Sequence, residues 1–182
     1  PAGVATAAGA TITQLHAEAL MGPPPAKVNH HYTRTTEVAT YIARGDGAAI
    51  EYTPMFTYMG FRYVQLSGVG RPTNATLTAH FVHTELEEVG ELRLADADGS
   101  GALQRVQRGV RASIRSNFQS IPTDCPQRGR RGWLADAWLT APTVLHGFDA
   151  AAALSAFVQL IEDAQDPGSG ALPDVVPNYR YG

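Results

Sequence analysis

The chain has 182 residues, of which 44% are hydrophobic and 17% are charged, and its net charge at pH 7 is -3. This length is sufficient for one or two domains with buried cores, and the mildly acidic balance does not indicate nucleic acid or a membrane surface as a partner. The single cysteine excludes an internal disulfide bond, and neither a signal-peptide pattern nor an apolar run long enough for a transmembrane helix is present, which leaves the localisation open.

The first half of the chain carries strand-like patterns. Apolar and polar residues alternate within residues 11–16, 61–66 and 76–81. Clusters of glycine and proline separate these segments and are typical of turns. Short strands with regular turns favour an antiparallel β-sandwich, which we expect to occupy residues 1–95.

After Ala95 the apolar spacing changes from two residues to three or four, which is typical of helices. The first helix is predicted from one apolar stripe, formed by Leu103, Val106, Val110, Ile114 and Phe118. Either Asp98 or Ser100 would be suitable as its N-cap. The change of period predicts a domain boundary near residues 96–101.

Two further helices are expected in the second half. A short one should lie within residues 133–145 and end near Pro142, because proline disrupts a helix interior. Another follows from the spacing of apolar residues over 154–161, with Asp149 before it and the Asp-Pro-Gly sequence 166–168 after it. Strands followed by helices predict two domains in sequence.

The most informative segment, residues 121–137, reads IPTDCPQRGRRGWLADA. Its two prolines restrict the backbone around a turn, and its carboxylates, Asp124 and Asp136, can accept hydrogen bonds from vicinal hydroxyl groups. Arg128 can add charge-assisted hydrogen bonds, and the indole of Trp133 can cover the apolar face of a pyranose ring. This combination predicts a sugar-binding loop.

Four segments of this chain, in the same order, resemble the α-L-rhamnosidases of glycoside hydrolase family 78. Residues 51–68 (EYTPMFTYMGFRYVQLSG) are similar to a family segment that contains the pattern GFRY. Residues 117–123 (NFQSIPT) resemble the approach to the family signature, which begins TDCPQR as residues 123–128 do. Residues 165–177 (QDPGSGALPDVVP) are similar to its continuation. Four ordered matches are more specific than one short motif.

The resemblance implies a fold and an activity. The expected fold is an antiparallel β-sandwich followed by the first helices of an (α/α)6 barrel, with residues 96–182 forming the truncated N-terminal part of the six-hairpin catalytic domain. The expected activity of the family is inverting hydrolysis of terminal α-L-rhamnose from rhamnosides, without a cofactor or metal. In the family, the residues that match Asp124, Asp136 and Trp133 contact the sugar, and Arg128 is carried over with them as a substrate-binding residue.

The chain departs from the family pattern where the general acid is expected. The family has a glutamate in the triplet after the arginine of CPQR, and that position falls at about Arg130 here. A guanidinium group stays protonated and cannot act as this acid. The family's general base lies far downstream of the matched segments. We therefore expect a partial protein that carries no catalytic residue and that is inactive as it stands.

Other interpretations of these residues remain open at this point. Asp124 could cap a turn, Asp136 could be an ordinary acid at a helix start, and Trp133 could belong to a core. Arg128 could be a structural ion-pair partner of either carboxylate. Two alternative functions are a rhamnose-binding pseudoenzyme and a calcium-dependent or protein-binding module, the latter because residues 96–101 (DADGSG) resemble half of a calcium loop.

Overall fold

The computed structural model describes residues 7–29, 37–46, 48, 51–70, 72–74, 76–91, 93, 99 and 101–178. The chain divides into two compact units, Pro1–Phe81 and Val82–Gly182. The proposed boundary at residues 95–96 lies in a stretch, 94–98, that is outside the described residues, as do the predicted N-caps Asp98 and Ser100 and most of the suggested calcium loop. Each unit is considered separately below.

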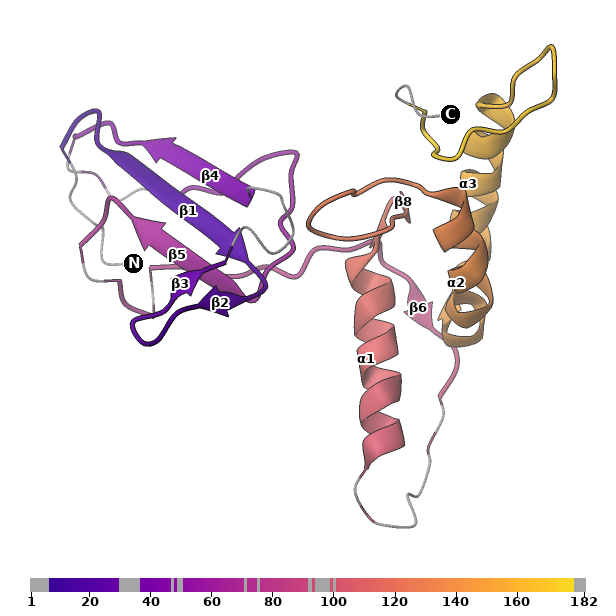
Figure 1. Cartoon of the computed structure of the whole chain (residues 1–182), viewed down its shortest axis with the longest axis horizontal. Coiled ribbons are helices and arrows are strands. Elements are labelled where there is room, and N and C mark those ends of the chain that lie inside the picture. The colour runs from indigo at the N-terminus through magenta and orange to yellow at the C-terminus, as the bar shows by residue number, and fades with distance from the viewer. Residues whose placement is uncertain are drawn as a thin grey trace. The chain divides into compact units, whose positions relative to one another are not determined.

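The first unit contains a three-stranded antiparallel sheet. Strand β1 (Thr11–Ala17) is its centre and pairs with β4 (Glu37–Ile42) on one side and with β5 (Tyr63–Ser67) on the other (Figure 1). In this register Gln14 lies opposite Ala39. The alternating residues predicted around positions 11–16 and 61–66 therefore do form paired strands, because neighbouring strands satisfy their backbone hydrogen bonds.

A second, two-stranded antiparallel sheet in this unit pairs β2 (Leu20–Met21) with β3 (Lys27–Val28). Two polar residues are buried nearby. The Glu37 carboxylate accepts a hydrogen bond of 3.0 Å from the Gly60 backbone N–H, and the Nδ1 atom of His16 lies 3.2 Å from the Glu37 carbonyl oxygen. Burial lowers the pKa of the His16 imidazole more than the hydrogen bond to the Glu37 carbonyl raises it. These contacts supply hydrogen bonds that buried polar groups require.

The strand predicted over residues 76–81 is wrong. This segment has no regular secondary structure, and both Leu77 and Phe81 are exposed. Alternation alone cannot form a strand, because a strand also needs a partner for its backbone groups and a core for its apolar face. Thr73 and Thr76 instead close a local turn, in which the Thr76 N–H donates to the Thr73 carbonyl at 2.9 Å.

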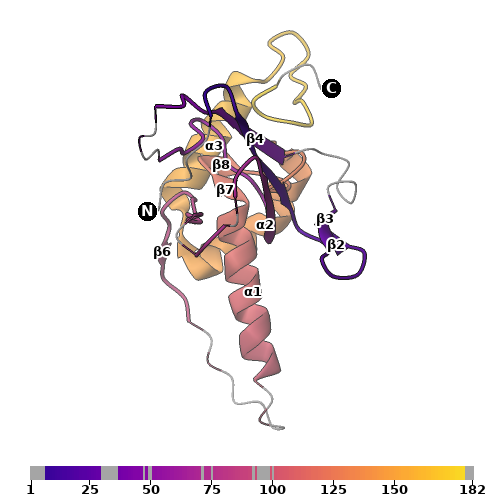
Figure 2. The same ribbon diagram turned by 90° about the vertical axis from the view of Figure 1, so that its left-hand side faces the viewer.

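The described part of the second unit contains three helices joined by short strands. The helices are α1 (Ala102–Ser116), α2 (Leu134–Gly147) and α3 (Ala151–Asp163). The antiparallel strand pairs are β6 (Glu87–Glu88) with β9 (Phe148–Asp149), and β7 (Phe118–Gln119) with β8 (Ile121–Pro122). Figures 1 and 2 both place the C-terminal end of α1 beside the β7–β8 hairpin. The predicted order of strands followed by helices is confirmed.

Helix α1 confirms the predicted apolar stripe only at its C-terminal end. Ile114 packs against the core, and Phe118 just beyond the helix is buried. Leu103 and Val106, nearer the start, are exposed. Its N-cap is Gly101, whose positive φ of 64° suits glycine, and no side chain of the described residues caps the helix.

Helix α2 continues through Pro142, so the predicted end near that residue is wrong. A proline inside a helix removes one backbone hydrogen bond. The turn that follows carries Val144, which is almost completely buried against Phe118 and Phe148. We attribute the continuation of the helix to this packing, since burial of an aliphatic side chain contributes about 1.5–3 kcal/mol.

Two apolar clusters hold the second unit together. The first combines Phe118 and Phe148 from the short strands with Val144 from α2. The second combines Ala137 of α2, Phe157 of α3 and the buried residues around Val176. Contacts between α2, α3 and the chain after α3 therefore fix the start of α2, where the candidate site lies.

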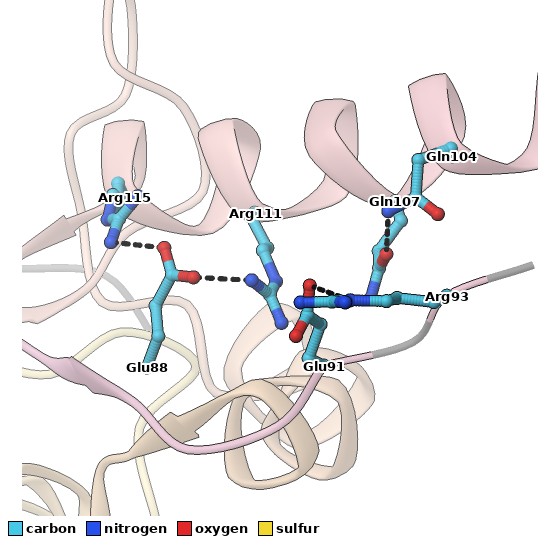
Figure 3. A network of polar contacts seen from close by, with 7 residues as sticks. All are labelled: Glu88, Glu91, Arg93, Gln104, Gln107, Arg111 and Arg115. Carbon is cyan, nitrogen blue, oxygen red and sulfur yellow. Dashed lines mark hydrogen bonds and ion pairs between the residues drawn. The ribbon is translucent and has the colours of Figure 1, made fainter. Parts of the chain in front are cut away.

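A polar network joins α1 to the strand that precedes it (Figure 3). The Glu88 carboxylate forms ion pairs with the guanidinium groups of Arg111 and Arg115, the latter at 2.5 Å. The Arg115 guanidinium also lies 5.3 Å from the centre of the Phe148 ring. Both arginines are less than one-third exposed, with side-chain exposures of 19% and 29%, so solvent screens them less than surface pairs. The network anchors α1 on the first apolar cluster.

Candidate functional site

The segment between β8 and α2 has no regular helix or strand, yet its backbone is held by its own hydrogen bonds. The Asp124 N–H donates to the Arg131 carbonyl at 3.0 Å, and the Arg130 N–H donates to the Cys125 carbonyl at 3.2 Å. Arg130 adopts a positive φ of 54°. These bonds fold residues 124–131 into a closed loop whose ends lie side by side.

The Asp124 carboxylate points into this loop. Its Oδ1 atom accepts a hydrogen bond of 2.9 Å from the Arg131 N–H, and its Oδ2 atom accepts one of 3.1 Å from the Cys125 thiol. The Cys125 sulfur in turn accepts the Gly129 N–H at 2.9 Å. A carboxylate offers about four acceptor positions, so this arrangement fixes the orientation of Asp124 while leaving positions for a ligand.

Gly129 is required for this orientation, and we expect Gly129→Ala to disturb it. A Cβ atom at this position would lie 2.0 Å from Asp124 Oδ2, so the carboxylate would have to move and lose its hydrogen bonds within the loop. The expected loss of stability is about 1–3 kcal/mol. The Cys125 thiol, the single cysteine of the chain, should also react faster with a disulfide reagent, because its bond to Gly129 is disturbed.

The measurements are urea denaturation and the rate of thiol modification. Gly168→Ala is the matched control, because a Cβ there would meet its nearest neighbour, Asp166 Oδ1, at an ordinary 3.5 Å. Equal thiol reactivity in Gly129→Ala and the parent chain would contradict the proposed role of Gly129.

A cavity of about 480 Å³ opens between α1, the loop and α2. Both sequence-predicted carboxylates belong to its lining, Asp124 from the loop and Asp136 from the first turn of α2. The rest of the lining is mostly apolar, with Val110, Ile114 and Leu139 among its residues. The structure therefore brings together on one cavity the two acids that the sequence analysis had singled out.

Trp133 and Arg128 are outside this lining. Trp133 is half-buried, precedes α2 and forms an antiparallel bridge with Val175. Arg128 is exposed, and within the described ranges it forms no ion pair with Asp124 or Asp136. The interpretation of Arg128 as an ion-pair partner is therefore wrong, and the sugar-binding roles of Trp133 and Arg128 stay predictions.

Arg130 is the residue at which the sequence comparison predicts the family's general-acid position, and this assignment stays a prediction. Arg130 is half-buried, and its guanidinium donates to the Gln127 carbonyl at 3.3 Å. The polar lining residues that sequence reasoning missed include Asn117, which follows the last residue of α1, and Thr123, which precedes Asp124. Both lie in the segment 117–123 that resembles the family, and that segment was the signal that could have identified them.

In the described part of the chain, no group of three or more His, Cys, Asp or Glu side chains could hold a metal ion. None of the helices found in those residues has the length and hydrophobicity needed to cross a bilayer.

Comparison with protein-family models matches nearly the whole chain. The model of the bacterial α-L-rhamnosidase concanavalin-like domain matches residues 2–83. The model of the bacterial α-L-rhamnosidase six-hairpin glycosidase domain matches residues 99–182. These matches confirm the predicted fold class, an antiparallel β-sandwich followed by the first helices of an α/α barrel.

Known proteins lead to the same family. An α-L-rhamnosidase of Streptomyces avermitilis is 32% identical over 93% of this chain, which covers 16% of that relative. The structure of the α-L-rhamnosidase from Dictyoglumus thermophilum aligns with 98% of this chain at 35% identity and a TM-score of 0.86, and 20% of that protein is covered. The Streptomyces avermitilis enzyme in complex with L-rhamnose aligns with 97% of the chain, at 31% identity and a TM-score of 0.82, with 17% of that protein covered.

The chain thus spans about one-fifth or less of the length of these relatives. It shares both halves of the matched region with them, the strands and the helices, in the same order. The chain belongs to the bacterial α-L-rhamnosidases, glycoside hydrolase family 78.

Proposed function

We propose that the cavity binds the terminal α-L-rhamnose of rhamnosides. The observation that carries this proposal is that Asp124 and Asp136, from two different segments, line one cavity. Support comes from family membership and from the related Streptomyces avermitilis enzyme, which was solved in complex with L-rhamnose.

The chemistry of the cavity suits a sugar. Carboxylates accept hydrogen bonds from hydroxyl groups, and charge-assisted bonds of this kind are stronger than neutral ones. Apolar walls such as Val110, Ile114 and Leu139 can contact the C–H faces and the methyl group of a deoxy sugar. The volume of about 480 Å³ lies within the range of about 300–1,000 Å³ that is usual for small-molecule sites.

Family membership suggests inverting hydrolysis of rhamnosides as the activity of the whole protein. That reaction needs one carboxylic acid to protonate the leaving oxygen and one carboxylate to activate water. Residues 128–132 read RGRRG and offer no carboxylate at the family's acid position. We therefore infer that the chain as it stands binds rhamnose without cleaving the glycosidic bond.

The proposal is tested by titrating the purified chain with L-rhamnose in a calorimeter, alongside hydrolysis of p-nitrophenyl α-L-rhamnopyranoside. We expect binding, and we expect it to weaken by about 10- to 100-fold in Asp124→Ala, because a charge-assisted hydrogen bond is lost. No p-nitrophenol should be released.

Two controls complete the design. Glu91→Ala removes an exposed acid outside the cavity and should bind L-rhamnose as the parent does. Absence of rhamnose binding by the parent chain would refute the proposed site. Release of p-nitrophenol by the parent but not by Asp124→Ala would refute the proposed loss of hydrolysis.

A further inference from the structure

The Thr123 hydroxyl is a buried polar group beside the candidate site. Thr123 is only 8% exposed, and its Oγ1 atom has no hydrogen-bond partner among the described residues. Its backbone N–H is satisfied, because it donates to the Asn117 carbonyl at 2.7 Å. The residue lines the same cavity as Asp124 and Asp136. An unpartnered hydroxyl is costly inside a protein, so its presence in the wall of a cavity calls for a physical reason.

Asn117 is a second polar residue of the same wall. Its Nδ2 atom donates to the Ser113 carbonyl at 2.9 Å, which settles the orientation of the amide, and its Oδ1 atom is buried without a partner in the described part of the chain. Asn117 follows the last residue of α1 and lines the cavity. Because the C-terminal end of a helix carries a partial negative charge, this wall favours hydrogen-bond donors over acceptors.

The charged residues of the lining also favour a ligand that donates hydrogen bonds. The described lining contains the carboxylates of Asp124 and Asp136 but no lysine, arginine or histidine. Because ionised carboxylates only accept hydrogen bonds, a ligand that contacts Asp124 or Asp136 must bring donors, as a sugar does with its hydroxyl groups.

We propose that Thr123 is an additional sugar-binding residue, which turns its buried hydroxyl toward the cavity and accepts a hydrogen bond from a ring hydroxyl of the rhamnose held by Asp124 and Asp136. This inference rests on the proposed function and adds to it the contacts at the wall of the cavity. The Thr123 side chain can exchange its methyl and hydroxyl positions by one rotation about χ1, since threonine populates more than one staggered rotamer. A bound hydroxyl gives the hydroxyl-inward rotamer a partner that the protein itself does not provide.

The decisive variant is Thr123→Val, which replaces the hydroxyl by a methyl group of nearly the same shape. The parent structure gives that hydroxyl no partner, so the melting temperature of Thr123→Val should equal or exceed that of the parent. Its dissociation constant for L-rhamnose should rise about 5- to 30-fold, as expected for the loss of one hydrogen bond to a ligand. Thr40→Val, an exposed residue of β4, is the matched control and should bind as the parent does.

Deoxy analogues separate a direct contact from a structural effect. Titration with 2-, 3- and 4-deoxy-L-rhamnose should identify one analogue that binds the parent and Thr123→Val with the same affinity, because the hydroxyl that contacts Thr123 is absent from it. A role of Thr123 in structure alone would weaken all the analogues equally. Thr123→Ser keeps the hydroxyl and should bind within about twofold of the parent.

The outcomes distinguish this inference from the proposed function. Rhamnose binding by the parent together with undiminished affinity in Thr123→Val would overturn the inference and leave the proposed function standing. A Thr123→Ser variant as weak as Thr123→Val would also overturn it. Absence of binding by the parent would overturn both.

Discussion

Replacing Phe148 by alanine should lower the free energy of unfolding of the second unit by about 3–5 kcal/mol, the usual cost of removing a buried phenylalanine. Phe148 is 1% exposed and packs with Leu86, Phe118 and Val144. Its ring also faces the Arg115 guanidinium. The change would therefore leave a cavity and withdraw the aromatic face on which part of the polar network lies.

The measurement is urea denaturation followed by circular dichroism at a helix-sensitive wavelength. Trp138→Ala is the matched control, because this aromatic residue of α2 is 74% exposed and should change stability by no more than about 0.5 kcal/mol. If Phe148→Ala cost less than about 1 kcal/mol, the apolar cluster around it would not be the core of this unit.

Gly132→Ala should destabilise the same unit by about 3 kcal/mol, because its side chain has no room. A Cβ atom at this position would lie 2.0 Å from the Val176 carbonyl oxygen and 3.1 Å from both Ile121 Cδ1 and Phe157 Cε2. The Val176 N–H also donates to the Gly132 carbonyl at 2.8 Å. The neighbour is backbone, which cannot rotate away as a side chain can, so the loop and the segment around Val176 must separate.

Thermal unfolding and tryptophan fluorescence report on this change, since both tryptophans of the chain, Trp133 and Trp138, belong to the second unit. Gly147→Ala is the control: nothing lies within 4 Å of a Cβ there, so its melting temperature should equal or slightly exceed that of the parent. A Gly132→Ala chain as stable as Gly147→Ala would show that the close approach to Val176 can relax without cost.

The sequence predicted the acidic residues of the candidate site, but it did not predict most of the other residues that line the cavity. Asp124 and Asp136 were recognisable because the signature around them fixes their spacing, and both line the cavity. Trp133 and Arg128 belong to the same signature but lie outside the lining. The path of the loop decides this, and it depends on contacts such as Asp124 with the Arg131 N–H, which spacing alone does not reveal.

For the fold, too, the sequence pattern predicted some elements correctly, whereas others depend on packing contacts. Strong periodicity located α1 and α3, since their apolar residues recur over several turns. The wrong predictions concern segments whose secondary structure depends on contacts with residues far away in the sequence. Residues 76–81 alternate but find no neighbouring strand, whereas Pro142 is tolerated in α2 because Val144 is buried beyond it. In both places the presence or absence of tertiary contacts, not local preference, decides the structure.

The shape of the loop also determines at which of its positions an additional acidic side chain could be accommodated. At position 129 any side chain would collide with the Asp124 carboxylate. An acidic residue introduced there would therefore displace Asp124. Position 130 already accommodates a long side chain at its positive φ of 54°. A glutamate in place of Arg130 could therefore leave the hydrogen bonds of Asp124 intact, whereas an acid in place of Gly129 would displace the Asp124 carboxylate.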